Sequence, residues 1–362
     1  MKRIFIAATK QNDGKTTASL GLVCNFQSRF KKVGFIKPIG QRYLEEEGVK
    51  FDEDSYLIEE VCKIKCGLKD MSPIAVEKGF TEKYISRPDK KSITEQIKKS
   101  FKRVSQGNDL VIIEGTGHAG VGSVFDHSNA TVARLLGSKV IIISSGGIGR
   151  PIDEIVLNKA LFEKEGVKVL GVIVNKVLPA KFDRISQLVR KGLERKGVPV
   201  LGIIPYDPSL AWPTIKQVLD ETSFELLCGR EYLANYVARV IVGAMKPQDA
   251  VKYIVDDSLL ITPGDRDDII TAALDCFRDS AKKKLKIAGV ILTGGITLES
   301  QTMESLKNAA VPVMLAKSDT YDVASSVHDL TVKITPQDSE KIKTAVRLVR
   351  NNVDMDKILK GM

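Results

Sequence analysis

The sequence predicts an α/β fold: a doubly wound, mostly parallel sheet in residues 1–225, followed by a smaller α/β domain in residues 226–362. Short apolar runs alternate with longer segments of helical period, which is the pattern of strands covered by helices. The runs are nearly continuous in Val and Ile, as expected of strands buried on both faces. With 362 residues, 43% of them hydrophobic, the chain is large enough for two separate cores.

The first domain is expected to hold six strands and six helices. The strands are predicted at residues 3–9, 32–39, 110–115, 139–145, 168–175 and 200–205. The helices are predicted at about 14–31, 55–66, 92–106, 129–137, 153–165 and 180–196. Because ligands of open parallel sheets bind beyond the carboxyl ends of the strands, functional residues should gather there.

The boundary between the domains is expected near residue 225. The pattern weakens between 207 and 230, where Pro208 and Pro213 stand close together. Short strands resume near 239–245, and strand–turn–helix units follow from residues 258, 287 and 311. Apolar positions at helical spacing then predict a packed terminal helix in the second domain. A contact between two subunits of a dimer is one place where this helix could pack.

Composition narrows the classes of function. No apolar run approaches the ~20 residues of a membrane span and no signal segment precedes the first strand, so we expect a cytoplasmic protein without a membrane partner. The net charge is +10, but only 6% of residues are aromatic and no nucleic-acid-binding motif is present, which argues against a nucleic-acid partner. Five scattered cysteines predict neither a zinc site nor structural disulfides.

A nearly complete Walker A loop, GxxxxGK[ST], follows the first strand directly. Thr9 stands where the pattern has its first Gly, whereas Gly14, Lys15 and Thr16 keep the GKT core between a strand and a helix. Backbone N–H groups of such a loop surround phosphates, the Lys neutralises their charge and the Thr hydroxyl ligates Mg²⁺. We therefore expect ATP and Mg²⁺ as ligands. The predicted nucleotide contacts are Lys10, Asn12, Asp13, Gly14, Lys15, Thr16 and Thr17.

Further residues of the first domain resemble the dethiobiotin synthetase and cobyrinic acid a,c-diamide synthase group over residues 1–225. The resemblance is carried by the GKTT loop, Lys37–Pro38, Glu114–Gly115 and Asn175. Lys10 is also similar to the signature lysine of deviant Walker A loops, although Gln11 and Asn12 replace the glycines usual there.

The resemblance implies a role for several side chains. Lys15 and Lys37 would be the catalytic residues. Lys37 would face the γ-phosphate and a substrate carboxyl. Alternatively, Lys37 is simply an exposed lysine at a strand end. Thr16, Asp54 and Glu114 would hold Mg²⁺, with Asp52 as a weaker candidate. A carboxylate after a strand is alternatively only a helix cap.

Asn175, at the end of the fifth strand, is the implied adenine contact. Pro205 opens a turn that would pack against the base or simply end its strand. The Gly-rich loop from 115 to 122 should line the substrate site through His118 and Gly120. His118 either acts as a general base or only forms hydrogen bonds within the loop.

The second domain resembles the DRTGG domain. The matching residues are Asp265, Arg266, Thr293, Gly294 and Gly295. They follow two strands, so they either meet at one sheet edge as a charged, glycine-rich pocket or only shape two turns. The two-domain pairing is similar to the N-terminal region of long phosphate acetyltransferases, without the acetyltransferase domain, and it implies a regulatory setting and a homodimer.

Two hypotheses of function follow. The chain is an ATP-dependent ligase-type enzyme that activates a small carboxylate through phosphoryl transfer, or it is a slow or non-catalytic nucleotide sensor. The sensor would regulate a partner such as a phosphate acetyltransferase through a DRTGG dimer. Cobyrinate amidation is not expected, because no glutaminase constellation of Cys, His and Glu accompanies the scattered cysteines. Dethiobiotin synthesis is not expected either, because the residues after 225 are unnecessary for it.

Overall fold

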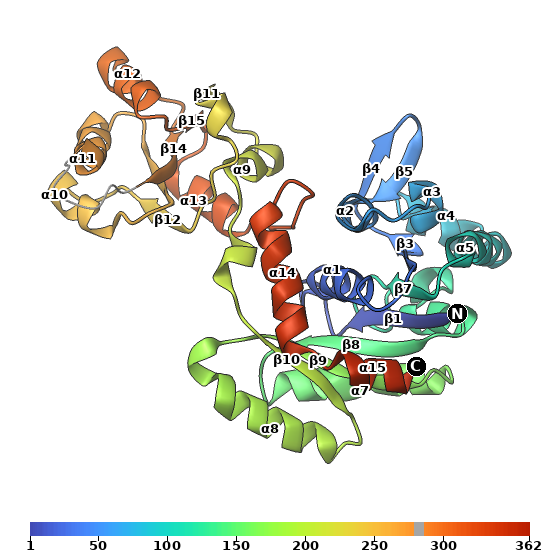
Figure 1. Ribbon diagram of the computed structural model, residues 1–362. Coiled ribbons are helices and arrows are strands. Elements are labelled where there is room, and N and C mark those ends of the chain that lie inside the picture. Colours follow the sequence, from blue (N-terminus) through green and yellow to red (C-terminus); the bar gives the residue numbers. More distant parts are fainter. Residues whose placement is uncertain (279–285) are drawn as a thin grey trace. The chain divides into compact units, whose positions relative to one another are not determined.

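The computed structural model describes residues 1–278 and 286–362 and divides into two compact units (Figure 1). The first unit combines Met1–Asp207 with Ile334–Met362, and the second is Pro208–Lys333. Within the described residues, no helix is both long and apolar enough to cross a membrane.

The first unit is built on a six-stranded parallel sheet, as the sequence predicts. Its strand order is β10-β9-β8-β1-β7-β2. The strands are β1 (Lys2–Ala8), β2 (Val33–Ile36), β7 (Leu110–Glu114), β8 (Lys139–Ser145), β9 (Val169–Val177) and β10 (Val200–Pro205). Every residue of β2 and β7 is buried, which explains why these strands read as continuous apolar runs.

Six helices of the first unit match the predicted ones with shifted ends. They are α1 (Lys15–Phe26), α2 (Glu53–Cys62), α5 (Lys90–Ser105), α6 (Asn129–Leu135), α7 (Arg150–Lys164) and α8 (Phe182–Glu194). Short elements between β2 and α5 were not predicted. These are β3 (Ile39–Gly40), β4 (Tyr43–Glu46), β5 (Val49–Asp52), α3 (Leu68–Met71), β6 (Ile74–Ala75) and α4 (Phe80–Ser86).

The β4–β5 hairpin has a direct consequence for the site, because β5 ends at Asp52 and α2 begins at the next residue. Its turn is Glu47–Gly48, and both residues have positive φ, as a two-residue type I′ turn requires. The hairpin therefore fixes the position of the first turn of α2 beside β2.

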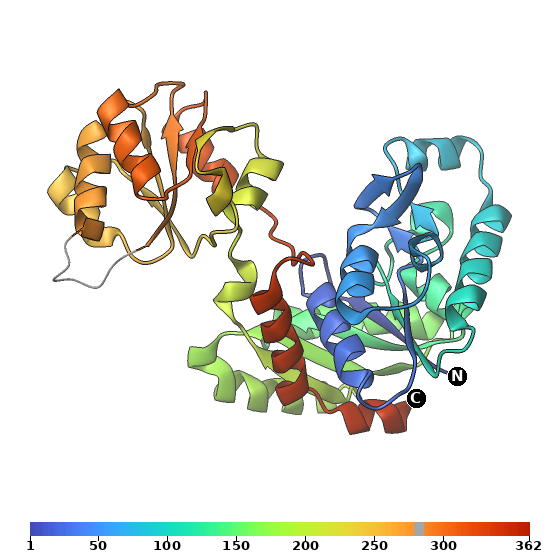
Figure 2. The same ribbon diagram turned by 45° about the horizontal axis from the view of Figure 1, so that its top comes forward.

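The terminal helices α14 (Ser339–Asn352) and α15 (Met355–Gly361) belong to the first unit, which corrects the expected placement in the second domain. In Figures 1 and 2, α14 lies alongside α1. A Cβ added at Gly21 would lie 2.3 Å from Val349 Cγ2, and Asn25 Nδ2 donates to Val346 O at 3.1 Å. Helical spacing predicts that a face is buried but does not say which core buries it.

The division between the units also lies earlier than residue 225. It falls between Asp207 and Pro208, ahead of α9 (Ile215–Glu221). Ile215 and Val218 of this helix are buried in the core of the second unit. The weak pattern after 207 therefore belongs to the start of the second unit.

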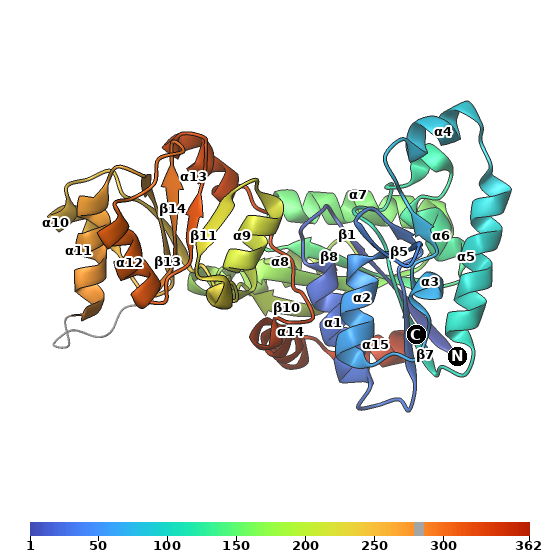
Figure 3. The same ribbon diagram turned by 90° about the horizontal axis from the view of Figure 1, so that it is seen from above.

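The second unit is a small α/β sandwich, as expected. Its sheet has the order β11-β15-β14-β13-β12, and only the edge strand β11 is antiparallel. The strands are β11 (Glu225–Cys228), β12 (Arg239–Val242), β13 (Ser258–Pro263), β14 (Ile287–Thr293) and β15 (Val313–Leu315). The remaining helices are α10 (Pro247–Ala250), α11 (Asp267–Arg278), α12 (Ser300–Asn308) and α13 (Thr320–His328). As Figure 3 shows, α11 and α12 cover one face of the sheet, and α9 and α13 cover the other.

Candidate functional site

The loop between β1 and α1 has the backbone shape of a phosphate-binding loop. Asn12 and Gly14 both have positive φ, at 63° and 91°, and Gly14 is the residue before α1. A Cβ at Gly14 would lie 2.2 Å from Asn175 Nδ2, so a side chain is excluded there for reasons of space as well as conformation. Lys15 and Thr16 consequently open the first turn of α1, where the helix dipole favours an anion.

Asp13 closes this loop from within. Its buried Oδ2 accepts hydrogen bonds from Thr9 Oγ1 at 2.6 Å and from Lys10 N at 3.0 Å. The threonine in place of the first Walker Gly is therefore part of the loop's own support. The carboxylate of Asp13 is occupied by these hydrogen bonds within the loop, and the predicted contact of Asp13 with a nucleotide stays a prediction. Sequence reasoning also missed the role of the Thr9 side chain, for which spacing gives no signal.

The end of β9 braces the same loop. Asn175 is buried, and its Nδ2 donates to Asp13 O at 2.9 Å. Lys176, which was not singled out from the sequence, donates from Nζ to Asn12 O at 2.6 Å. Because the amide of Asn175 holds the loop backbone, its contact with adenine stays a prediction.

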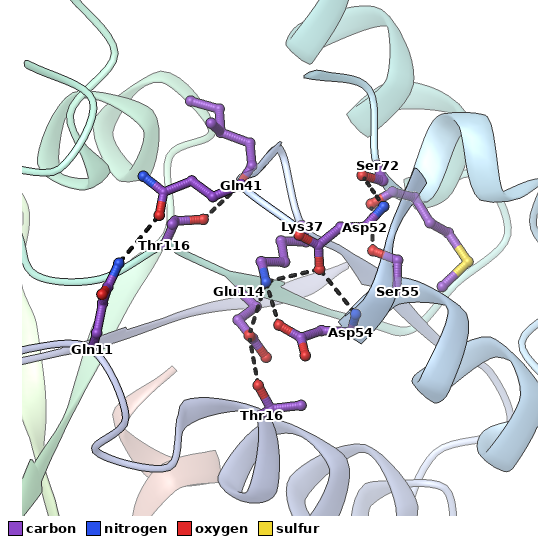
Figure 4. A network of polar contacts seen from close by, with 12 residues as sticks. Gln11, Thr16, Lys37, Gln41, Asp52, Asp54, Ser55, Ser72, Glu114 and Thr116 are labelled. Atoms are coloured by element: carbon purple, nitrogen blue, oxygen red, sulfur yellow. Dashed lines mark hydrogen bonds and ion pairs between the residues drawn. The ribbon is translucent and has the colours of Figure 1, made fainter. Parts of the chain in front are cut away.

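A lysine surrounded by carboxylates lies beside the loop. Lys37 follows β2, and its Nζ is 2.8 Å from Asp52 Oδ1 and 3.8 Å from Glu114 Oε1, with Asp54 as a further ion-pair partner (Figure 4). All four side chains are buried. The reading of Lys37 as an exposed lysine at a strand end is therefore excluded.

The three carboxylates differ in their local roles. Asp52 is the N-cap of α2, since its Oδ1 accepts from Asp54 N at 2.9 Å. The helix-cap interpretation thus applies to Asp52. Asp54 lies in the first turn of α2, and Glu114 is the last residue of β7. The hairpin and two strands together bring these groups to one edge of the sheet.

Burial sets the electrostatics of this cluster. For Lys37, burial alone would lower the pKa, but Asp54, Asp52 and Glu114 together raise it above its ordinary value. Burial and the neighbouring Asp54 carboxylate raise the pKa of Glu114 to about 7, against the pull of Lys37. Burial lowers the pKa of Lys15, although Glu114 opposes the shift. The edge is therefore rich in charge that solvent does not screen.

Glu114 and Thr16 form a feature that fits a divalent cation. Thr16 Oγ1 lies 3.4 Å from Glu114 Oε1, while the buried Glu114 Oε2 has no hydrogen-bond partner among the described residues. In residues 1–278 and 286–362, no group of three or more His, Cys, Asp and Glu side chains is arranged to hold a metal ion alone. This donor set suits Mg²⁺, which commonly takes one or two carboxylates and completes its shell with water and nucleotide phosphates.

The remaining predicted contacts of the first unit are more peripheral. His118 is exposed, and its Nδ1 accepts from Gly120 N at 3.2 Å within the loop after β7. Asn129 fixes that loop by donating to His118 O at 2.7 Å. Pro205 ends β10 opposite Val177 and is half-buried, at the same sheet edge as the phosphate-binding loop. The hydrogen bond with Gly120 N agrees with the alternative that His118 bonds within the loop, and a role of His118 as a general base stays a prediction.

In the second unit, the DRTGG residues meet at one edge, because β13 and β14 are parallel neighbours with Pro263 opposite Thr293. Thr293 Oγ1 lies 2.8 Å from Thr320 Oγ1, and Arg266 Nε is 2.8 Å from Asp268 Oδ1. Gly294 and Gly295 have positive φ and donate to Ser318 O and Ala316 O at 2.8 and 2.9 Å, while Asp265 lies between β13 and α11. The motif therefore shapes two adjoining turns.

These features define a P-loop α/β protein joined to a second α/β unit. The family model described as AAA domain matches residues 2–214, more than half of the chain, so the protein belongs to this family. The model described as DRTGG domain matches residues 217–330.

The alignments with curated relatives extend over both units of the chain. The chain is 25% identical over 366 residues to a phosphate acetyltransferase of Nitratidesulfovibrio vulgaris, covering 98% of this chain and 51% of that protein. It is 27% identical over 377 residues to a phosphate acetyltransferase of Pseudomonas putida, with coverages of 98% and 51%. The chain thus spans about half the length of the curated relatives it matches.

Solved structures resemble parts of the chain more distantly. The MinC:MinD cell division protein complex of Aquifex aeolicus is 18% identical, with a TM-score of 0.39 over 58% of this chain and 84% of that chain. The CBS and DRTGG regulatory region of a Clostridium perfringens pyrophosphatase, complexed with diadenosine tetraphosphate, is 18% identical, with a TM-score of 0.28 over 48% and 86%.

Proposed function

We propose that the first unit binds Mg-ATP at its phosphate-binding loop and that the chain acts as a nucleotide-responsive regulatory module. The single observation that carries this proposal is the juxtaposition of Lys15, Thr16 and the unpartnered oxygen of Glu114. Anionic phosphates suit a left-handed glycine turn that precedes a helix N-terminus, and a cation suits the free carboxylate oxygen.

Each residue has a distinct part in this proposal. Backbone N–H groups of the loop and the Lys15 ammonium bind the phosphates, which favour the charged form of Lys15. Thr16 and Glu114, with Asp54 nearby, hold Mg²⁺, which when bound offsets phosphate charge. Asn175 and Lys176 keep the loop in its binding shape through bonds to its backbone.

The environment of Lys37 favours the hypothesis of a regulatory module over that of a ligase. Its ammonium is buried among three carboxylates rather than presented to a substrate. The match to phosphate acetyltransferases over about half their length supports such an enzyme as the regulated partner. In this proposal the DRTGG unit transmits the nucleotide state, and a homodimer through that unit remains part of the hypothesis.

A ligase-type reaction is the second candidate, and the same cluster is the observation that favours it. If Mg²⁺ and nucleotide draw Asp54 and Glu114 away from Lys37, its ammonium becomes available to a γ-phosphate and a small carboxylate. The resemblance of Lys37–Pro38 to dethiobiotin synthetase belongs to this alternative.

Turnover measurements separate the two candidates. ADP formation from Mg-ATP is followed without substrate and then with diaminopelargonate or corrinoid acids, with Lys15→Ala as the blank for contaminating ATPases. The regulatory proposal predicts saturable ATP binding with negligible ADP release under every condition. Substrate-stimulated ADP release that disappears in Lys15→Ala would instead establish the ligase-type activity.

A further inference from the structure

Two cysteines lie against each other where α1 and α2 pack side by side. Cys24 Sγ in α1 is 3.0 Å from Cys62 Sγ, the last residue of α2. Figures 1 and 3 both show the two helices adjacent to one another. The residues are 38 positions apart in the chain, so their encounter is a product of the fold and not of local sequence.

The separation is close to that of a covalent bond. Sulfur atoms in a disulfide are about 2.05 Å apart, so closing the pair requires an approach of about 1 Å. The end of α2 is fixed at this place, because Gln27 Nε2 donates to Cys62 O at 2.7 Å and Lys63 ends the helix in the left-handed conformation. The pair therefore needs a side-chain adjustment and no rearrangement of helices.

The two thiols are chemically unequal. Cys24 is partly exposed, whereas Cys62 is buried. The hydrogen bond between the two thiols lowers the pKa of Cys24 against the effect of burial, and together with burial it raises the pKa of Cys62. A thiolate is the nucleophile in disulfide exchange, so Cys24 is suited to attack and Cys62 to resolve.

We propose that Cys24 and Cys62 form a reversible disulfide that fastens the phosphate-loop helix to the helix bearing Asp54. The oxidant is a low-molecular-weight disulfide such as oxidised glutathione. The Cys24 thiolate attacks one of its sulfurs and expels the other half as a thiol. Cys62 then loses its proton to solvent, attacks Cys24 Sγ and expels the second half as a thiol, so two protein thiols are oxidised and one small disulfide is reduced.

The disulfide would affect the candidate site because it joins the two helices that begin there. Both helices start at the candidate site: Lys15 and Thr16 open α1, and Asp54 lies in the first turn of α2. The cysteines lie near the opposite ends of these helices, about 12 Å along each axis at 1.5 Å per residue. The bond would restrict movement of one helix against the other, and its formation is independent of whether the site binds a nucleotide.

Peptide mapping of the full-length chain tests this directly. The protein is incubated in glutathione buffers of increasing oxidised fraction, alkylated and digested with trypsin, which cuts after Lys63 and Lys65 and so separates Cys62 from Cys66. We expect a peptide linking Cys24 to Cys62, formed ~10-fold faster than any adduct at Cys66 and fully reversed by dithiothreitol.

Variants assign the roles of the two thiols. Cys62→Ser should stop at a stable glutathione adduct on Cys24, while Cys66→Ser, the matched control, should still form the linked peptide. A persistent glutathione adduct on Cys24 of the native chain, a link from either cysteine to Cys66, or no reaction at all would overturn the proposal. The mapping on the native chain decides the matter even if a variant fails to fold.

Discussion

The carboxyl edges of the two sheets share a parallel α/β geometry but differ in how their polar groups are satisfied. In the first unit, Glu114 Oε2 and Asp52 Oδ2 are buried without hydrogen-bond partners, while the other oxygen of each carboxylate lies near Nζ of the buried Lys37. In the second unit, Arg266 pairs with Asp268 at the surface, and no buried side-chain oxygen or nitrogen among its described residues lacks a partner. The first edge therefore has buried polar atoms available to a charged ligand. At the second edge, Arg266 pairs with Asp268, and Gly294 and Gly295 donate to backbone carbonyls.

The largest expected effect lies in the first unit. Replacing Lys37 with Met leaves buried carboxylates without their cation, which should lower the free energy of unfolding by about 3–5 kcal/mol. Urea unfolding measures this, with the exposed Lys31→Met as the control for removing a lysine. A loss below ~1 kcal/mol would mean that the cluster is open to water.

A pH effect of intermediate size should come from Glu114. Its pKa in the folded chain is about 7, raised chiefly by burial, so between its ordinary value of 4.5 and 7 the folded state binds more protons than the unfolded state. This contribution to stability is complete below pH 4.5 and is lost as pH rises through 7, amounting to about 3 kcal/mol. Unfolding curves in EDTA should show the loss in the native chain and a smaller one in Glu114→Gln. Identical profiles would contradict the assignment.

The smallest effect is expected at the second edge. Arg266→Ala removes an ion pair whose partner, Asp268, is half exposed, and such surface pairs contribute about 0–1 kcal/mol. Thermal or urea unfolding should therefore change little, and nucleotide affinity of the first unit should not change. A destabilisation comparable to that of Lys37→Met would show that the two edges are not different in kind.

Helical periodicity and continuous apolar runs were sufficient to predict the six strands of the first unit's main sheet and the six longer helices that accompany them. The β4–β5 hairpin was not predicted, because its strands are short and charged and show no apolar run. The two-residue turn at Glu47–Gly48 gives little further sequence signal. The packing of α14 on α1 could not be predicted because Gly21 and Val349 are complementary only in space.

The site shows the same limit. The GKT core was predicted from a motif, and Lys37 and Glu114 were predicted from the resemblance to the dethiobiotin synthetase group. The structure brings these side chains to one edge of the sheet. The Thr9–Asp13 hydrogen bond and the contact of Lys176 with the loop depend on three-dimensional closure. Sequence patterns therefore identified the charged groups but not the bonds that hold the loop in shape.

Calorimetric titration with Mg-ATP tests the central claim most directly. The account predicts saturable heat for one site per native chain, affinity about 10- to 100-fold weaker in Lys15→Ala because a charge-assisted phosphate contact is lost, and unchanged affinity in the control Lys31→Ala. No heat with the native chain, or equal affinity in Lys15→Ala, would contradict it.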